Sequence, residues 1–190
     1  PVLCDVDKDT FCMTVSSITP LITSKTKAIL VVHAFGHMAY MPEVMSLAEQ
    51  HSIHVIEDVA EAPGSTINKK LAGTFGEISC FSFFANKIFT SGEGGACLSV
   101  NKRLIEKIKI LRDHGMKKTK RYYHEFIGFN YRMTNMQAAI GLSQVSKFHE
   151  IINHRKSIED LYIKNFKGIE GIYYRKYARW CEGVFWLATI

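Results

Sequence analysis

The sequence lacks several features that would place it in a specialised class of protein. It has no Cys-x-x-Cys pair, and its five cysteines stand far apart, at Cys4, Cys12, Cys80, Cys97 and Cys181. An odd number of scattered cysteines argues against a disulfide framework or a zinc site and favours reduced thiols in the cytoplasm. No repeat or low-complexity stretch is present, and the apolar runs are far too short to span a membrane. We therefore expect a globular cytoplasmic protein without membrane association.

The charge balance has an excess of one sign. The 190 residues include 24 Lys and Arg against 18 Asp and Glu, which gives a net charge of +6. Much of this excess lies in the run Lys-Lys-Thr-Lys-Arg at 117–121. The run is interpreted either as a solvated loop or as an anion site for a nucleic acid or a nucleotide diphosphate. Because no nucleic-acid-binding motif accompanies it, nucleic acid ranks last among the candidate partners.

Strand and helix patterns alternate in the first third of the chain, which predicts an α/β fold. Residues 28–32 and 53–56 read as buried strands, and Pro42 between them suits the first turn of a helix. The apolar stripe of this helix contains Val44, Met45, Leu47 and Ala48. A strand–helix–strand unit implies parallel strands with a right-handed crossover, and ligands bind beyond the carboxyl ends of such strands. His33 and Asp58 fall at those ends.

Further strands and helices follow along the chain. Residues 64–76 read as a glycine-rich loop, 78–84 and 96–100 as strands, and Asn101 as the cap of a helix. A capping-box pattern at 134–137 opens another helix. The apolar stripe of that helix is interpreted as packing and contains Met136, Ile140, Val145, Phe148, Ile152, Ile158 and Leu161.

Both ends of the sequence predict interrupted structure. Residues 1–6 read like the middle of a sheet, and 184–190 read like a strand that stops without a partner. The pattern therefore indicates the central fragment of a longer protein.

Lys87 is the residue with the clearest chemical signal. It follows the apolar strand-like run 78–84, although lysine is among the residue types least often buried. An amine removed from water loses stabilisation of its charged form and becomes a usable nucleophile and base. An amine that forms a Schiff base and a carboxylate such as Asp58, which could hold a pyridinium nitrogen, together suit pyridoxal phosphate (PLP) chemistry. The structural alternatives are an exposed loop lysine and a helix-capping aspartate.

Several runs together resemble one protein family, the DegT/DnrJ/EryC1/StrS group of PLP-dependent nucleotide-sugar aminotransferases. The resemblance covers about residues 1–160 and is strong because the runs keep the order and spacing of the family. The matching runs are 25–29, Val32-His33 with Gly36, Ile56-Glu57-Asp58 with Ala60, 82–95, Arg112 with His114-Gly115, and 128–142. Within the family, 57–62 and 128–135 are most similar to the branch of GDP-perosamine synthases.

The resemblance implies a fold and a division into domains. The fold would be that of aspartate aminotransferase (fold type I), an α/β large domain with a mostly parallel sheet flanked by helices, incomplete at both ends. Residues 1–167 would form the large PLP-binding domain without its N-terminal portion, and 168–190 would begin the small C-terminal domain. The protein would be a homodimer with a shared active site.

The resemblance also assigns roles to five residues. Lys87 would carry PLP as a Schiff base and then move the proton, and Asp58 would keep the pyridine nitrogen protonated. Ser82 would bind the phosphate, or else make a local strand bond. Asn130 would reach the partner's cofactor, or else serve as a turn residue. Glu61 would lie beside the cofactor ring, where relatives often have glutamine.

The implied reaction is amino transfer, with glutamate as donor, to a 4-keto-6-deoxy nucleotide sugar such as GDP-4-keto-6-deoxymannose. One alternative is a PLP-dependent sugar dehydratase, although those relatives replace the lysine with histidine. Another is a non-catalytic remnant or interaction protein of the same fold. His114, Arg121 and His124 either line the sugar-nucleotide entrance or belong to a solvated loop. His33 and His37 have no third ligand nearby in the sequence, so we predict no metal site.

Overall fold

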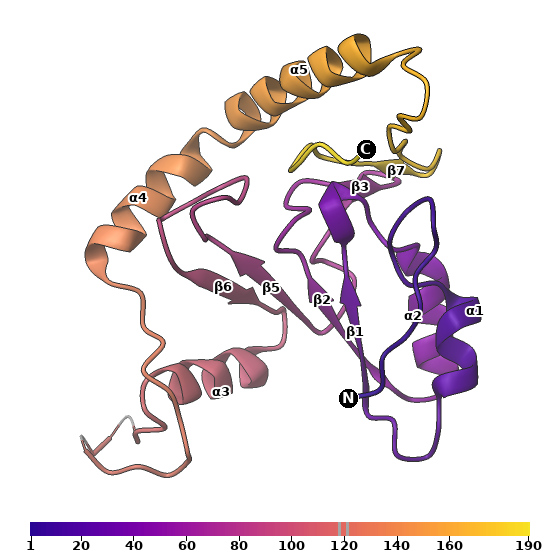
Figure 1. Cartoon of the computed structure of the whole chain (residues 1–190). Coiled ribbons are helices and arrows are strands. Elements are labelled where there is room, and N and C mark those ends of the chain that lie inside the picture. Colours follow the sequence, from indigo (N-terminus) through magenta and orange to yellow (C-terminus); the bar gives the residue numbers. More distant parts are fainter. Residues whose placement is uncertain (118, 121) are drawn as a thin grey trace.

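The architecture is an α/β sheet with helices on its sides (Figure 1). A computed structural model describes residues 1–117, 119–120 and 122–190. Its main sheet has the strand order β1-β2-β5-β6. The strands are β1 (Ala28–Val32), β2 (His54–Asp58), β5 (Ile78–Ser82) and β6 (Gly95–Leu98). The first three are parallel and β6 pairs antiparallel with β5 at the edge, which confirms the expected mostly parallel sheet.

The crossover between β1 and β2 forms one side of the core. After the short 3-10 helix η2 (Ala34–Gly36), helix α2 (Met41–Gln50) begins with Pro42 in its first turn, as predicted. Its buried side chains pack with the residues of β1 and β2 that point to the same side of the sheet. Helix α1 (Val15–Ile18) and the 3-10 helix η1 (Thr19–Leu21) lie beside α2 (Figure 1).

A second, smaller core holds the segment after β5. Ile88 and Phe89 are buried against Val184 and Trp186, and Phe148 stacks on Phe89 with ring centroids 5.2 Å apart. Residues from three distant parts of the sequence therefore pack around the loop between β5 and β6. This core positions Lys87, which directly precedes Ile88.

A small antiparallel sheet occupies part of the segment that was predicted as a glycine-rich loop. It contains β3 (Thr66–Ile67), β4 (Lys70–Leu71) and β7 (Cys181–Glu182), in the order β4-β3-β7. Asn68 and Lys69 form the hairpin turn with φ values of 51° and 65°. Positive φ at both turn residues matches the twist of a tight hairpin. The prediction of a loop across 64–76 was therefore wrong at these strands.

The helical part of the chain begins as predicted and then departs from the prediction. Asn101 caps α3 (Lys102–Arg112) through its side-chain oxygen, and the capping box opens α4 (Asn135–Ser146). The long helix predicted from the apolar stripe is interrupted at Lys147, where φ and ψ are −102° and 22°, and α5 (Phe148–Phe166) follows. The two helices run in succession along the side of the molecule (Figure 1).

The packing interpretation of the apolar stripe holds for only part of it. Phe148 and Ile152 pack against the second core. In contrast, exposed side chains occupy the rest of α4 and the end of the stripe, at Met136, Ile140, Val145 and Leu161. In α4 only Gly141 is buried, because little of the described chain covers that helix.

The two ends of the chain also differ from the prediction. No strand of the described residues includes residues 1–6. Val6 pairs with Met13 in an isolated bridge, and the Cys4 thiol donates to Ser17 Oγ at 3.0 Å. Residues 184–190 are irregular, and the strand near them is β7 at Cys181–Glu182. Val184, Phe185 and Trp186 are buried in succession, which fits core packing of an irregular segment better than the alternation of a half-buried strand. None of the helices in the described ranges combines the length and apolar character that a membrane crossing requires.

Candidate functional site

Lys87 lies in the loop that follows β5, with its amine largely removed from solvent. Its backbone N–H donates to the Phe84 carbonyl at 3.0 Å, which makes a tight turn after the strand. The side chain is only 13% exposed. Its Nζ lies 3.6 Å from Glu61 Oε1 and 3.9 Å from the centroid of the Trp186 ring. The amine therefore lies between a carboxylate and an aromatic face and does not extend into solvent as a loop lysine would.

Glu61 is held in place by the backbone of the segment after β1. Its Oε2 accepts a hydrogen bond from the Phe35 N–H at 2.7 Å, while Oε1 faces Lys87. Phe35 has φ of 51°, a left-handed conformation that is uncommon for a bulky residue. Its ring lies 5.7 Å from that of Trp186. The structure thus brings Lys87 and Glu61 together.

Asp58 and Ser82 end neighbouring parallel strands. Asp58 is the last residue of β2, and its Oδ1 accepts from the Ala60 N–H at 2.9 Å. Ser82 is the last residue of β5, and its Oγ accepts from the Phe84 N–H at 3.3 Å. Each side chain makes the local bond that a structural role requires. Within the described residues, Asp58 Oδ2 makes no hydrogen bond, so it remains available to a ligand at this edge of the sheet.

Asn130 lies outside this cluster. It is exposed, and its backbone pairs in an isolated bridge with Asp113. The described contacts of Asn130 do not include Lys87 or Glu61.

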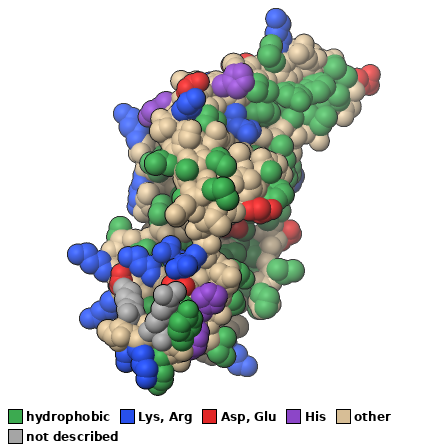
Figure 2. Space-filling model, turned by 90° about the vertical axis from the view of Figure 1, so that its left-hand side faces the viewer, with side chains coloured by type: hydrophobic (Ala, Val, Ile, Leu, Met, Phe, Trp, Pro, Cys, Tyr) green, Lys and Arg blue, Asp and Glu red, His purple; other side chains and the backbone are tan. Residues whose placement is uncertain are grey.

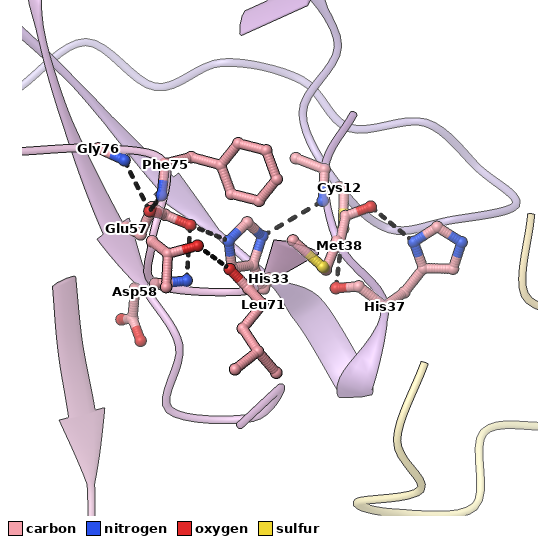
Figure 3. Close-up of polar contacts among 12 residues, drawn as sticks. Cys12, His33, His37, Met38, Glu57, Asp58, Leu71, Phe75 and Gly76 are labelled. Atoms are coloured by element: carbon pink, nitrogen blue, oxygen red, sulfur yellow. Dashed lines mark hydrogen bonds and ion pairs between the residues drawn. The ribbon is translucent and has the colours of Figure 1, made fainter. Parts of the chain in front are cut away.

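Glu57 precedes Asp58 and forms a buried network on the opposite face of the sheet (Figure 3). Its Oε1 accepts from the N–H groups of Phe75 and Gly76, both at 2.7 Å. Its Oε2 accepts from Gly73 N–H at 2.8 Å and from His33 Nε2 at 3.1 Å. Successive residues of a strand point to opposite faces. Anchoring Glu57 therefore fixes which way the end of β2 presents Asp58.

The two histidines of this region are structural. His33 Nδ1 accepts from the Ala39 N–H at 3.3 Å, so its proton lies on Nε2 and is donated to Glu57. Burial raises the pKa of Glu57, but the hydrogen bonds from His33 and the loop amides outweigh burial and leave that pKa below its usual range. His37 Nδ1 donates to the Met38 carbonyl at 2.7 Å, and Figure 3 shows its ring apart from that of His33. Among the described residues no three side chains are grouped as metal ligands.

A basic cavity lies in a different part of the molecule. It has a volume of about 680 Å³ and is lined by Lys109, Ile110, Arg112, Asp113, His114, Met116, Lys117, Tyr122, His124 and Arg132. Figure 2 shows lysine and arginine side chains gathered over this lobe. The cavity contains both His114 and His124 but shares no lining residue with the Lys87 cluster. Arg121 and Lys118 lie outside the described residues.

Comparison with known proteins identifies the family. The model of the DegT/DnrJ/EryC1/StrS aminotransferase family matches residues 1–190. The chain belongs to this family. The membership in this family that the sequence runs around Lys87 and Asp58 predicted is thereby confirmed.

Named relatives and solved structures agree with this assignment. The chain is 40% identical to the GDP-perosamine synthase of Escherichia coli O157:H7 over 190 residues, which are 100% of this chain and 52% of that protein. It thus spans about half the length of the curated relatives it matches. The structure of Streptomyces venezuelae DesV, solved with a ketimine intermediate, has a TM-score of 0.88 and 29% identity over 96% of this chain and 49% of that chain. The Escherichia coli GDP-4-keto-6-deoxy-D-mannose-3-dehydratase, solved with hydrated PLP, has a TM-score of 0.84 and 25% identity over 96% of this chain and 50% of that chain.

These neighbours define the fold as that of fold type I PLP-dependent enzymes. Aminotransferases of the family depend on PLP. The side chains at the sheet edge fit this cofactor by their chemistry, because they offer an amine at Lys87, a carboxylate oxygen at Asp58 and a hydroxyl at Ser82. Sequence reasoning did not find Trp186 beside the amine. The only local signal was the apolar run 184–187, which gives no information on a contact about a hundred residues away in the sequence.

Proposed function

We propose that this chain belongs to a PLP-dependent aminotransferase that transfers an amino group to a nucleotide sugar. The observation that carries the proposal is the Lys87 amine, which is 13% exposed and lies 3.6 Å from Glu61 at the carboxyl edge of a parallel sheet. When bound, PLP supplies an electron sink for the carbon that gains or loses a proton. Family membership and the 40% identity to a GDP-perosamine synthase support the reaction class.

The residues of the chain would divide the work as follows. Lys87 would hold the cofactor covalently and, once its amine is released from that link, would move a proton to C4 of the sugar. Glu61 stabilises the protonated amine between transfers, since its carboxylate is already directed at Nζ by the Phe35 N–H. Asp58, whose Oδ1 already accepts from Ala60 N–H, would hold the pyridine nitrogen through its other oxygen, and Ser82 would hold the phosphate through its hydroxyl. A carboxylate at that position would keep the pyridine nitrogen protonated.

The proposed substrate is a 4-keto-6-deoxy nucleotide sugar, GDP-4-keto-6-deoxymannose in the first instance, and the proposed donor is glutamate. Support for the substrate comes from the relatives named GDP-perosamine synthase. The basic cavity with His114, His124 and Arg132 offers the positive charge that a nucleotide diphosphate requires. Because this cavity is separate from the Lys87 cluster, we propose that it serves the active site of a second subunit, with Asn130 reaching the partner's cofactor.

A dehydratase of the same fold is the second candidate, since one solved neighbour has that activity. Lys87 favours amino transfer, because the dehydratases that resemble this chain have a histidine in place of that lysine. A ketosugar that loses its 3-hydroxyl without gaining nitrogen would support the dehydratase.

The decisive experiment is reduction with borohydride after incubation with PLP, followed by peptide mass mapping. We expect a reduced adduct on Lys87, and we expect Lys87→Ala to lose both the adduct and amino transfer from glutamate to GDP-4-keto-6-deoxymannose. The matched control is Lys69→Ala, because Lys69 is an exposed lysine of the β3–β4 turn.

The assay uses this chain and a version extended to the length of its relatives. An adduct on Lys87 in the extended version alone would mean that the site needs the rest of the protein. The proposal is wrong if neither version forms an adduct, or if the Lys87→Ala variant transfers amino groups at the normal rate.

A further inference from the structure

The backbone around Lys87 is anchored at two successive carbonyls by side chains from the last third of the chain. The indole Nε1 of Trp186 donates to the Asn86 carbonyl at 2.9 Å. The guanidinium of Arg155 in α5 donates from Nη2 to the Lys87 carbonyl at 3.3 Å. Nη1 of the same guanidinium donates to the Trp186 carbonyl at 3.1 Å. These three hydrogen bonds link four residues in a ring that the peptide bond between Asn86 and Lys87 closes.

Trp186 also contacts the amine itself. The Lys87 Nζ lies 3.9 Å from the centroid of the indole ring, over its face. A cation over an aromatic face is attracted by the ring quadrupole, and tryptophan is the strongest of the aromatic partners. Trp186 as a residue is 7% exposed, so water competes little for this contact. The indole therefore acts on both ends of Lys87, on the amine through its face and on the neighbouring backbone through its N–H.

We propose that Trp186 is a positioning residue for the Lys87 amine and that Arg155 supports it, an inference that rests on the proposed function. A reacting amine must be held close to one geometry, and a displacement of about 1 Å can cost roughly a hundredfold in rate. Glu61 fixes the amine from one direction and is itself held by Phe35. Trp186 fixes it from another direction, and Phe35 packs against its ring.

The first test compares two variants of Trp186 in PLP-adduct formation. Trp186→Leu removes the aromatic face and the N–H, and we expect the rate of adduct formation at Lys87 to fall by about tenfold. Trp186→Phe keeps an aromatic face, so we expect it to recover part of that loss. Arg155→Met, which removes both guanidinium bonds and leaves the ring in place, should give a smaller loss than Trp186→Leu. Circular dichroism of each variant establishes that it is folded.

A second test leaves Trp186 unchanged and needs no activity. The chain has two tryptophans, and Trp180 packs against Tyr40 and His37. In the Trp180→Phe variant, Trp186 is the sole indole, so its fluorescence should be strongly quenched when PLP attaches to Lys87. In the matched Trp186→Phe variant, the fluorescence of Trp180 should be quenched much less.

The outcomes separate this inference from the proposed function. Absence of an adduct on Lys87 in the unsubstituted protein, in both lengths, overturns the proposed function and the positioning role with it. An adduct that forms equally fast in a folded Trp186→Leu variant overturns the positioning role alone. The same conclusion follows if the adduct forms in Trp180→Phe without a change in the fluorescence of Trp186.

Discussion

Replacing Glu57 with glutamine tests the buried network that orients the end of β2. The side chain is fully buried, and its two oxygens accept four hydrogen bonds, from Gly73, Phe75, Gly76 and His33. A glutamine amide has the same shape but presents an NH₂ group to one pair of these donors. If that group replaces Oε1, it faces the N–H of Phe75 and of Gly76. If the NH₂ group replaces Oε2, it faces the Gly73 N–H, which loses its acceptor. The His33 ring, which carries one proton, can then keep its bond to residue 57 or its bond to Ala39, but not both.

Either orientation therefore loses two hydrogen bonds. A hydrogen bond to a charged group contributes about 1.5–3 kcal/mol, so the loss is about 3–6 kcal/mol. A neutral amide is easier to bury than a carboxylate, which offsets part of this loss. We expect the free energy of unfolding to fall by about 2–4 kcal/mol, a large part of the roughly 5–15 kcal/mol typical of a domain.

The assay is urea unfolding at pH 7 followed by far-ultraviolet circular dichroism. With a slope of about 1–3 kcal/mol per molar urea, the midpoint should fall by roughly 1–2 M. The control is Glu49→Gln on the exposed side of α2, which should change stability by less than about 0.5 kcal/mol. A loss below about 1 kcal/mol for Glu57→Gln would refute the view that four hydrogen bonds hold this carboxylate.

The same variant predicts a dependence on pH. The pKa of Glu57 is lowered in the folded chain from the ordinary value of 4.5. A depressed carboxyl pKa contributes stability that is present above the unfolded pKa and is lost as the pH falls through the folded pKa. The difference in stability between the unsubstituted protein and Glu57→Gln should therefore be constant at neutral pH and shrink below about pH 4.5. A difference that grows in acid would contradict the assigned direction.

Two further substitutions test other features of the fold. Burial lowers the pKa of His37 from 6.5 to about 4. Protonation of His37 therefore favours the unfolded chain, and the free energy of unfolding of the unsubstituted protein should decrease as the pH is lowered from 6.5 to about 4. In the His37→Gln variant, the urea midpoint should depend less on pH across this range. An unchanged pH dependence would exclude His37 as its source. Gly36 and Gly168 both have φ above +80°, but only at Gly36 would a new Cβ overlap the Val184 carbonyl. Gly36→Ala should therefore lower the melting temperature in thermal unfolding by more than Gly168→Ala. Equal losses would mean that backbone conformation alone accounts for the cost.

Local signals predicted the parts of the fold in which local chemistry decides the conformation. The continuous apolar run 28–32 and the stripe after Pro42 predicted β1 and α2, and the capping side chains of Asn101 and Thr134 marked two helix starts correctly. Each of these elements depends on residues a few positions apart. Periodicity and capping are therefore sufficient to recognise them.

The errors occurred where the signal was weak or the decisive contact was distant. The β3–β4 hairpin has two-residue strands and turns at Asn68-Lys69 without the glycine that usually marks such turns. The helix break at Lys147 has neither proline nor glycine at that position. An apolar stripe predicts that one face of a helix packs against another surface. It does not predict whether that surface belongs to the same part of the chain, and Met136 of the stripe is exposed in the described structure.

The candidate site was predicted partly from the residue pattern and partly from family resemblance. The pattern singled out Lys87 after an apolar run and Asp58 at a strand end, and the resemblance then added Ser82, Asn130 and Glu61. Geometry added Glu61 as a partner at 3.6 Å and Trp186 as an aromatic neighbour. These contacts depend on how the second core packs, which no local pattern encodes.

The anchoring of the Lys87 loop has a consequence for the order in which the protein matures on the ribosome. A chain emerges from its N-terminus, and β1, β2, β5 and β6 are complete by Leu98. The bonds to the carbonyls of Lys87 and Asn86 come from residues 68 and 100 positions later. A nascent chain can therefore assemble its sheet long before the lysine is immobilised. On the proposed function, attachment of the cofactor to an immobilised Lys87 should therefore follow the emergence of the segment with Trp186 from the exit tunnel.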